Sequence, residues 1–134
     1  MHPLRPMFHP GSVAVVGASE DPSKWGFGVF NNIIRGGFEG RIYPVNPNAE
    51  TVLERRSYRS LRDIPERLDV VFIVIPAPFV VGAVRDAVEM GVRSLVIITA
   101  GFGETGTEGR KREAEMQSLC REAGVPAAGP NCMG

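Results

Sequence analysis

Short apolar runs recur along the chain, and each has a length that suits one β-strand. The run at residues 12–16 is rich in β-branched side chains. The run at residues 70–75 is apolar throughout, as expected for a strand that is buried on both faces. The whole pattern predicts five strands, at residues 12–16, 41–45, 70–75, 94–99 and 125–128.

Segments with helical periodicity separate these runs. Residues 26–35 place four apolar side chains at the spacing of one helix face, and a pair of glycines follows. Those side chains are Phe27, Phe30, Ile33 and Ile34. Residues 79–90 and 108–122 are also predicted helices, and a glycine closes each of them. Residues 57–68 form a polar link that contains one helical turn.

Strands that alternate with helices are joined by crossovers, and crossovers pair strands in parallel. The predicted fold is therefore α/β: a Rossmann-like, doubly wound open parallel sheet of about five strands in a single domain. We assign residues 1–11 to an irregular N-terminal lead-in and residues 12–134 to the domain. In such sheets ligands bind beyond the carboxyl ends of the strands, so the candidate site lies in the loops that follow them.

Composition and charge narrow the range of partners. Lys plus Arg and Asp plus Glu number 15 each, so the net charge is zero and no overall field favours nucleic acid or an anionic membrane. Cys120 and Cys132 make no disulfide framework and lack metal-ligand spacing, so we expect structural or incidental roles for both. Residues 70–84 are too short and too broken by proline to span a bilayer, and no export signal is visible. We expect a cytoplasmic protein.

The first strand ends in a loop with features of a phosphate site. Gly17 permits a sharp exit from the strand, and Gly26 and Gly28 let backbone approach a ligand at the start of a helix. Ser19, Ser23 and Lys24 add side-chain donors. The glycines are spaced more widely than in a dinucleotide fingerprint, and no Walker A motif closes the loop. From these residues alone, a phosphate site and a turn without a ligand are equally good interpretations.

The end of the second strand discriminates between ligands. NAD-binding folds usually place a carboxylate here, which accepts hydrogen bonds from the ribose hydroxyls. This sequence has Val45, Asn46 and Pro47 instead. A neutral asparagine is able to donate to a phosphorylated ribose, such as that of coenzyme A or NADP. The alternative is that Asn46 and Asn48 only shape the turn around Pro47.

Proline and glycine shape two further strand ends. Pro76 and Pro78 make a rigid, mostly apolar wall after the third strand. Thr99 offers a hydroxyl after the fourth strand, and Gly101 and Gly103 let a thin moiety pass close to the backbone. An ordinary glycine loop before the last helix is the alternative for this segment.

Five segments resemble, in order, parts of one family: "VAVVGASEDPSKWG", "GRIYPVNPNAE", "DVVFIVIPAPFV", "LVIITAGFGETG" and "AAGPNCMG". They are similar to the coenzyme A-binding domain of NDP-forming acyl-CoA synthetases. The same domain begins the alpha subunit of succinyl-CoA synthetase and occurs in some bacterial protein acetyltransferases. The resemblance runs from Gly11 to Gly134. It implies that the chain binds coenzyme A or acyl-CoA as the N-terminal domain of such a synthetase.

The resemblance also implies roles for particular residues. The phosphates and adenosine end of coenzyme A would meet Gly17, Ala18, Ser19, Lys24 and Gly26. The adenosine would be bordered by Val45, Asn46 and Pro47, and the site would be lined by Pro76 and Ala77. The pantetheine arm would be followed by Ile98, Thr99, Ala100 and Gly101, and Asn131 would lie toward the phosphorylated centre. A lysine that contacts coenzyme A in succinyl-CoA synthetase is replaced here by Ala49.

Partners follow from the same resemblance. In these enzymes a histidine of a following domain is phosphorylated, and an ATP-grasp module supplies the phosphate. This sequence has no histidine after His9, so we expect that the chain alone does not catalyse ligation. Two other functions stay open at this stage: a stand-alone module that senses coenzyme A or acyl-CoA, and an NAD(P)-dependent oxidoreductase domain.

Overall fold

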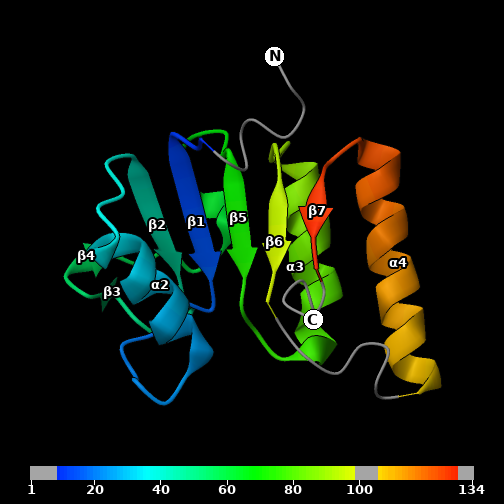
Figure 1. Ribbon diagram of the computed structural model, residues 1–134, viewed down its shortest axis with the longest axis horizontal. Coiled ribbons are helices and arrows are strands. Elements are labelled where there is room, and N and C mark those ends of the chain that lie inside the picture. Colours follow the sequence, from blue (N-terminus) through cyan, green and yellow to red (C-terminus); the bar gives the residue numbers. More distant parts are fainter. Residues whose placement is uncertain (1–8, 99–105, 130–134) are drawn as a thin grey trace.

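The computed structural model describes residues 9–98 and 106–129 (Figure 1). Five strands form a sheet in the order β2-β1-β5-β6-β7, and every neighbouring pair is parallel. Their bounds are β1 Ser12–Val16, β2 Arg41–Val45, β5 Val70–Ile73, β6 Leu95–Ile97 and β7 Ala127–Ala128. The predicted doubly wound parallel sheet is confirmed. The boundary between lead-in and domain at residue 12 stays a prediction.

Helices cover both faces of the sheet. They are α2 (Trp25–Arg35), α3 (Ala77–Glu89) and α4 (Thr107–Ala123), and Figure 1 shows α2 and α3 on opposite faces. Alternate side chains of a strand point to opposite faces. Val13 and Val15 accordingly pack with Phe30 of α2, whereas Ala14 packs in the cluster that contains Met116 of α4. The core is thus two apolar layers separated by the sheet.

Element boundaries differ from the predicted ones for identifiable reasons. The second predicted helix was expected to start at Phe79, but α3 starts at Ala77, with Pro76 at its N-cap and Pro78 inside the first turn. Proline suits the first turn of a helix because its missing N–H has no intrahelical partner there. Of the two prolines predicted to form a rigid apolar wall, Pro76 lines the cavity described below, whereas Pro78 belongs to the start of the helix.

A small hairpin was missed by the sequence pattern. Strands β3 (Thr51–Val52) and β4 (Arg55–Arg56) pair in antiparallel fashion around a turn at Leu53 and Glu54. Both turn residues have positive φ, 48° and 68°. Such turns normally carry Asn or Gly, so the sequence offers no signal for this one. The single helical turn predicted in the following link is confirmed, as a 3₁₀ turn at Leu61–Asp63.

The strand order fixes where the fold opens. From β1 the chain moves outward to β2 on one side, and later returns to β5 on the other side of β1. The loops that follow β1 and β5 therefore diverge, and they leave a crevice at the carboxyl ends of these two strands. Open α/β sheets bind their ligands at such a switch point.

Chemically reactive groups elsewhere in the described residues are few. Cys120 is buried in the cluster between α3, α4 and the sheet, and burial raises the pKa of its thiol. Cys132 lies outside the described residues. Across residues 9–98 and 106–129, no group of three or more His, Cys, Asp or Glu side chains is arranged to hold a metal ion. No helix in those ranges has the length and apolar character that crossing a bilayer requires.

Candidate functional site

A cavity of about 910 Å³ opens at the switch point between β1 and β5. Its volume is in the range of small-molecule sites, which is about 300–1,000 Å³. Nine of the residues predicted for the site line it: Gly17, Ser19, Lys24, Gly26, Val45, Asn46, Pro47, Pro76 and Ile98. They come from four separate strand ends, so the fold brings together residues that are up to 81 positions apart in the sequence, from 17 to 98.

The other predicted residues lie elsewhere. Ala18 is fully buried and packs with the core on the α2 side, and Ala77 packs partly buried against the core on the opposite face. Neither lines the cavity among the described residues. Thr99, Ala100, Gly101 and Asn131 lie outside the described residues.

Glycine is required where β1 ends. Gly17 has φ of +97°, and a Cβ there would lie 2.1 Å from the carbonyl oxygen of Val74. The N–H of Gly17 donates to the carbonyl oxygen of Val45 at 3.0 Å, which extends the β1–β2 pairing by one bond. This residue thus holds the three strand ends together, and its own N–H is not free for a ligand.

The loop between Gly17 and α2 is ordered by its own side chains. Ser19 accepts from the N–H of Asp21 through its hydroxyl oxygen at 3.0 Å, which leaves the hydroxyl proton free to donate. Asp21 accepts from both the N–H and the hydroxyl of Ser23, and these bonds lower the pKa of its carboxyl group. Ser23 was a candidate donor to a phosphate, but it is turned toward Asp21. Ser19 and Lys24 remain as side-chain donors at the cavity.

Two helices begin at the cavity. Lys24 is the N-cap of α2 and Pro76 is the N-cap of α3, and both residues line the cavity. Neither helix has a side-chain cap hydrogen bond or an acidic residue in its first turn. Helix N-termini carry a partial positive charge and unpaired N–H groups. At α3, however, Pro76 and Pro78 have no N–H and the N–H of Phe79 donates to the carbonyl oxygen of Pro76, so the N-terminus of α2 is the better place for an anion.

Asn46 shapes the turn after β2. Its Nδ2 donates to the carbonyl oxygen of Ala18 at 3.0 Å, and its Oδ1 accepts from the N–H of Asn48 at 2.8 Å. It also ties the first loop to the second, because Ala18 and Asn46 follow neighbouring strands. One of the two Nδ2 protons remains for a ligand. Most of the hydrogen bonding of Asn46 therefore shapes the turn, which is the alternative that the sequence left open.

A second contact anchors the first loop from outside. The Glu20 carboxylate accepts from the N–H of Leu53 at 2.7 Å, at the turn of the hairpin that the sequence pattern missed. The positive φ of Leu53 presents that N–H to the loop. The unusual turn and the first loop are therefore one connected structure.

Sequence reasoning missed several residues of the cavity wall. Arg59, Ser60 and Leu61 reach it from the polar link, where no motif marks them. Trp25 is the first residue of α2 and Phe79 lies in the first turn of α3, and both line the cavity although they are 68% and 65% exposed. Two large, exposed aromatic side chains at the rim of a cavity indicate a binding site, but their exposure cannot be predicted from the sequence. The remaining lining residues are Val16, Asn48, Val74, Ile75, Ala83 and Asp86.

A family model for a CoA binding domain matches residues 11–134. The chain belongs to the CoA-binding domain family. This CoA-binding domain is 43% identical to the alpha subunit of ADP-forming acetate–CoA ligase II from Pyrococcus furiosus, over 95% of its own length. The predicted resemblance to such synthetases is confirmed at the level of the domain.

Solved structures extend the comparison. The dinucleotide-forming acetyl-coenzyme A synthetase 1 of Ca. Korarchaeum cryptofilum, in complex with phosphate and ADP, superposes on 96% of the CoA-binding domain with a TM-score of 0.89 and 38% identity. The domain spans 28% of the P. furiosus ligase subunit and 27% of the Korarchaeum chain. By contrast, a conserved hypothetical protein of P. furiosus is covered over 97% of its length, with a TM-score of 0.69 and 26% identity. The same fold therefore occurs both inside long chains and as a chain of about this length.

Proposed function

We propose that this chain binds coenzyme A in the cavity at the β1–β5 switch point. The observation that carries the proposal is that nine residues implied by family resemblance line one cavity together. The cavity also combines what coenzyme A requires: an anion-favouring helix end at α2, a turn without a carboxylate at β2, and apolar walls. The family assignment supports the ligand, whereas the individual contacts are our inference.

The charged half of the ligand has a natural place near α2. The pyrophosphate lies at the N-terminus of α2, where the uncapped helix end and Lys24 attract it and the Ser19 hydroxyl donates to it. The adenosine lies against the turn formed by Asn46, Pro47 and Asn48. No acidic residue occurs in that turn to repel a phosphate on the ribose.

The pantetheine arm follows the apolar side of the cavity. Val74, Ile75 and Phe79 form a wall beyond the carboxyl end of β5, and Ile98 lies beyond the end of β6. A thin, mostly apolar arm gains hydrophobic burial along this wall. Its further path along Thr99, Ala100 and Gly101, and the approach of Asn131 to the phosphorylated centre, remain predictions.

The domain presents the thiol of coenzyme A to other parts of an NDP-forming acyl-CoA synthetase. Those parts are a phosphohistidine domain and an ATP-grasp module, which activate the acid. The proposal is supported by the ligases that this chain resembles, of which it spans about a quarter. Its contribution to the reaction is positioning, because a thiol held in place reacts as if it were highly concentrated.

Calorimetry with four ligands tests the binding proposal. Coenzyme A, dephospho-CoA, NAD and NADP are titrated into the protein under the same conditions. We expect heat of binding with coenzyme A and none with NAD. Tight binding of NAD without binding of coenzyme A would instead identify a dinucleotide site and end the proposal.

A stand-alone sensor of coenzyme A or acyl-CoA is the second candidate. It is favoured by the P. furiosus protein of similar length, which this chain covers almost completely. The size of the native polypeptide separates the two roles. A polypeptide of several hundred residues that carries this sequence at its N-terminus supports the synthetase, and one of about this length supports the sensor.

A further inference from the structure

Two cationic side chains line the cavity among the described residues, Lys24 and Arg59. They come from different elements, since Lys24 precedes α2 and Arg59 lies in the link after the hairpin. Coenzyme A likewise carries two separate phosphate groups, the pyrophosphate and the phosphate on its ribose. If Lys24 and the α2 N-terminus serve the pyrophosphate, the second cation is available for the other group.

The fold brings Arg59 to the end of β2. Tyr58 forms an isolated parallel bridge with Val45, the last residue of β2. The N–H of Tyr58 donates to the carbonyl oxygen of Pro44 at 2.9 Å, and the N–H of Asn46 donates to the carbonyl oxygen of Tyr58 at 2.9 Å. Because the bridge is parallel, the chain beyond Tyr58 leaves the sheet at the same edge as Asn46. Arg59 is thus placed beside the adenosine turn.

The Arg59 side chain has no hydrogen bond or ion pair with another described residue, and it is exposed. Two nearby arginines differ: Arg62 pairs with Asp86 and Glu89, and Arg56 of β4 lies over the ring of Tyr58. Asp86, which is the acidic residue on the described cavity wall, is therefore already paired with Arg62. Arg59 lines the cavity, and its guanidinium is not paired with an acid among the described residues.

A cation at this place has a defined chemical meaning. The carboxyl end of β2 is where dinucleotide folds contact the ribose, and an arginine there accommodates a phosphorylated ribose, as a carboxylate there accommodates free hydroxyls. A guanidinium also matches the geometry of a phosphate through two parallel N–H bonds. Asn46 is largely occupied by Ala18 and Asn48, so it is a weaker candidate for this contact.

We propose that Arg59 binds the ribose 3′-phosphate of coenzyme A and makes the site selective for coenzyme A over dephospho-CoA. The inference rests on the proposed function, because it takes the cavity as the coenzyme A site. Succinyl-CoA synthetase has a lysine where this chain has Ala49. In this chain Arg59, from the next segment, supplies the positive charge instead.

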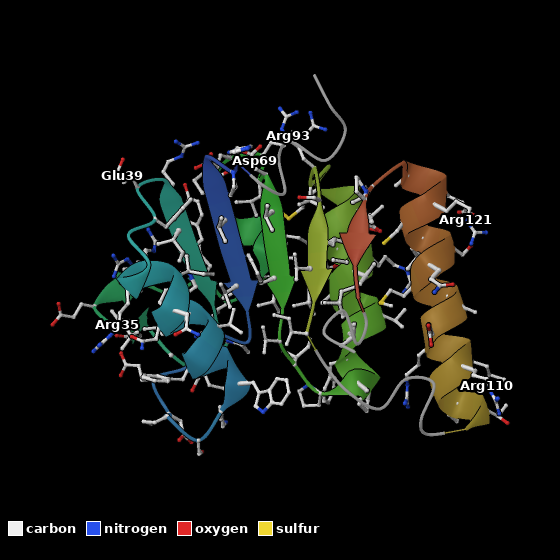
Figure 2. All side chains as sticks on the ribbon, in the orientation of Figure 1. Arg35, Glu39, Asp69, Arg93, Arg110 and Arg121 are labelled. Carbon is white, nitrogen blue, oxygen red and sulfur yellow. The ribbon has the colours of Figure 1, made fainter. Side chains whose placement is uncertain are left out.

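Calorimetry with matched variants tests this assignment. Wild type, Arg59→Gln, Lys24→Gln and Arg121→Gln are each titrated with coenzyme A and dephospho-CoA. Arg121 is the control, since it lies on α4 and points away from the sheet (Figure 2). We expect Arg59→Gln to weaken coenzyme A about tenfold, the effect of losing a charged hydrogen bond, and to leave dephospho-CoA unchanged. Lys24→Gln weakens both ligands by the same factor, and Arg121→Gln weakens neither.

The outcomes separate this inference from the proposed function. Wild type that binds coenzyme A and dephospho-CoA equally, or an Arg59→Gln variant that binds both more weakly by the same factor, would show that Arg59 does not bind the ribose phosphate. The cavity would still be the coenzyme A site. Failure of wild type to bind coenzyme A overturns both. Competition by adenosine 3′,5′-bisphosphate is expected to exceed that by the 2′,5′ isomer, and the reverse order would overturn the 3′ assignment. Circular dichroism melting curves confirm that each variant is folded.

Discussion

Gly26 packs directly against Gly17: a Cβ at residue 26 would lie 1.8 Å from the Gly17 carbonyl oxygen. The start of α2 and the end of β1 therefore touch through backbone alone. This contact sets the position of the helix N-terminus relative to the switch-point cavity, and it accounts for glycine at residue 26 without reference to any ligand.

The first prediction follows from that contact. Gly26→Ala forces α2 away from β1, so it should lower the free energy of unfolding by about 2–4 kcal/mol, as overpacking against rigid backbone does. It should also weaken coenzyme A, because the helix end moves. Gly28→Ala is the matched control: nothing lies within 4 Å of a Cβ there, so alanine should stabilise α2 by about 0.5–1 kcal/mol. Urea denaturation followed by circular dichroism measures both; equal effects of the two substitutions would contradict the packing argument.

Lys24 provides the second prediction. Lys24→Ala removes a charged donor at the α2 N-terminus and should weaken coenzyme A about 5- to 30-fold, which corresponds to about 1–2 kcal/mol. Lys24→Arg keeps the charge and should retain most of the affinity. Calorimetry gives both values. An unchanged dissociation constant in Lys24→Ala would mean that this side chain is only a surface charge.

Asn46 provides the third prediction, in two variants. Asn46→Ala removes the bonds to Ala18 and Asn48, and we expect it to cost about 1–2 kcal/mol of folding stability. Asn46→Asp keeps an acceptor for the Asn48 N–H but places a negative charge beside the phosphates. The aspartate variant should therefore bind coenzyme A more weakly than the alanine variant does. Paired urea and calorimetry measurements test this, and the opposite order of affinities would show that the charge at this turn does not reach the ligand.

The fourth prediction concerns pH and lies outside the cavity. Glu66 accepts two hydrogen bonds from Arg41 and one from the hydroxyl of Tyr43. The Arg41 bonds, as the main cause, hold the pKa of the Glu66 carboxyl below its ordinary value. A lowered pKa in the folded state means that the stabilisation is present above the pKa of unfolded glutamate, about 4.3, and is lost as pH falls through the folded value.

Glu66→Gln should therefore reduce stability at neutral pH and make the fall in melting temperature below pH 5 shallower than in wild type. The control is Glu39→Gln, at an exposed position whose side chain has no hydrogen bond or ion pair with another described residue. It should leave the pH profile unchanged. If the melting temperatures of wild type and Glu66→Gln fell equally as pH is lowered, protonation of Glu66 would not be a cause of the loss of stability in acid. Melting curves from pH 3 to pH 8 provide the measurement.

The sheet and its helices could be predicted because their signals are local. Apolar runs such as residues 70–75 and the helical spacing around Phe30 indicate buried strands and an amphipathic helix directly. The glycine and proline positions at strand ends then indicated where the cavity lies. Nine predicted residues line one cavity because the carboxyl ends of parallel strands meet at the same edge of the sheet.

The remainder depends on contacts between distant segments. Arg59 lies 14 positions beyond Val45, and only the Tyr58 bridge brings it to the cavity. The turn at Leu53 and Glu54 has positive φ without Gly or Asn, and its partner is Glu20 in another loop. Neither the turn nor the loop contains a sequence pattern that indicates their contact. Asn46 shows a different limit, because residue type indicated an amide at the turn but not which of its atoms was already bonded.

The exposure of Trp25 has a practical consequence for optical work on this protein. It is the sole tryptophan of the sequence, and 68% of its surface is in contact with water in the folded state. Unfolding changes the surroundings of such an indole little, so its emission is a poor measure of denaturation. Because Trp25 lines the cavity, we expect a ligand bound there to cover the same ring and to change its emission. Intrinsic fluorescence should therefore report occupancy of the cavity, while folding is better followed through the backbone.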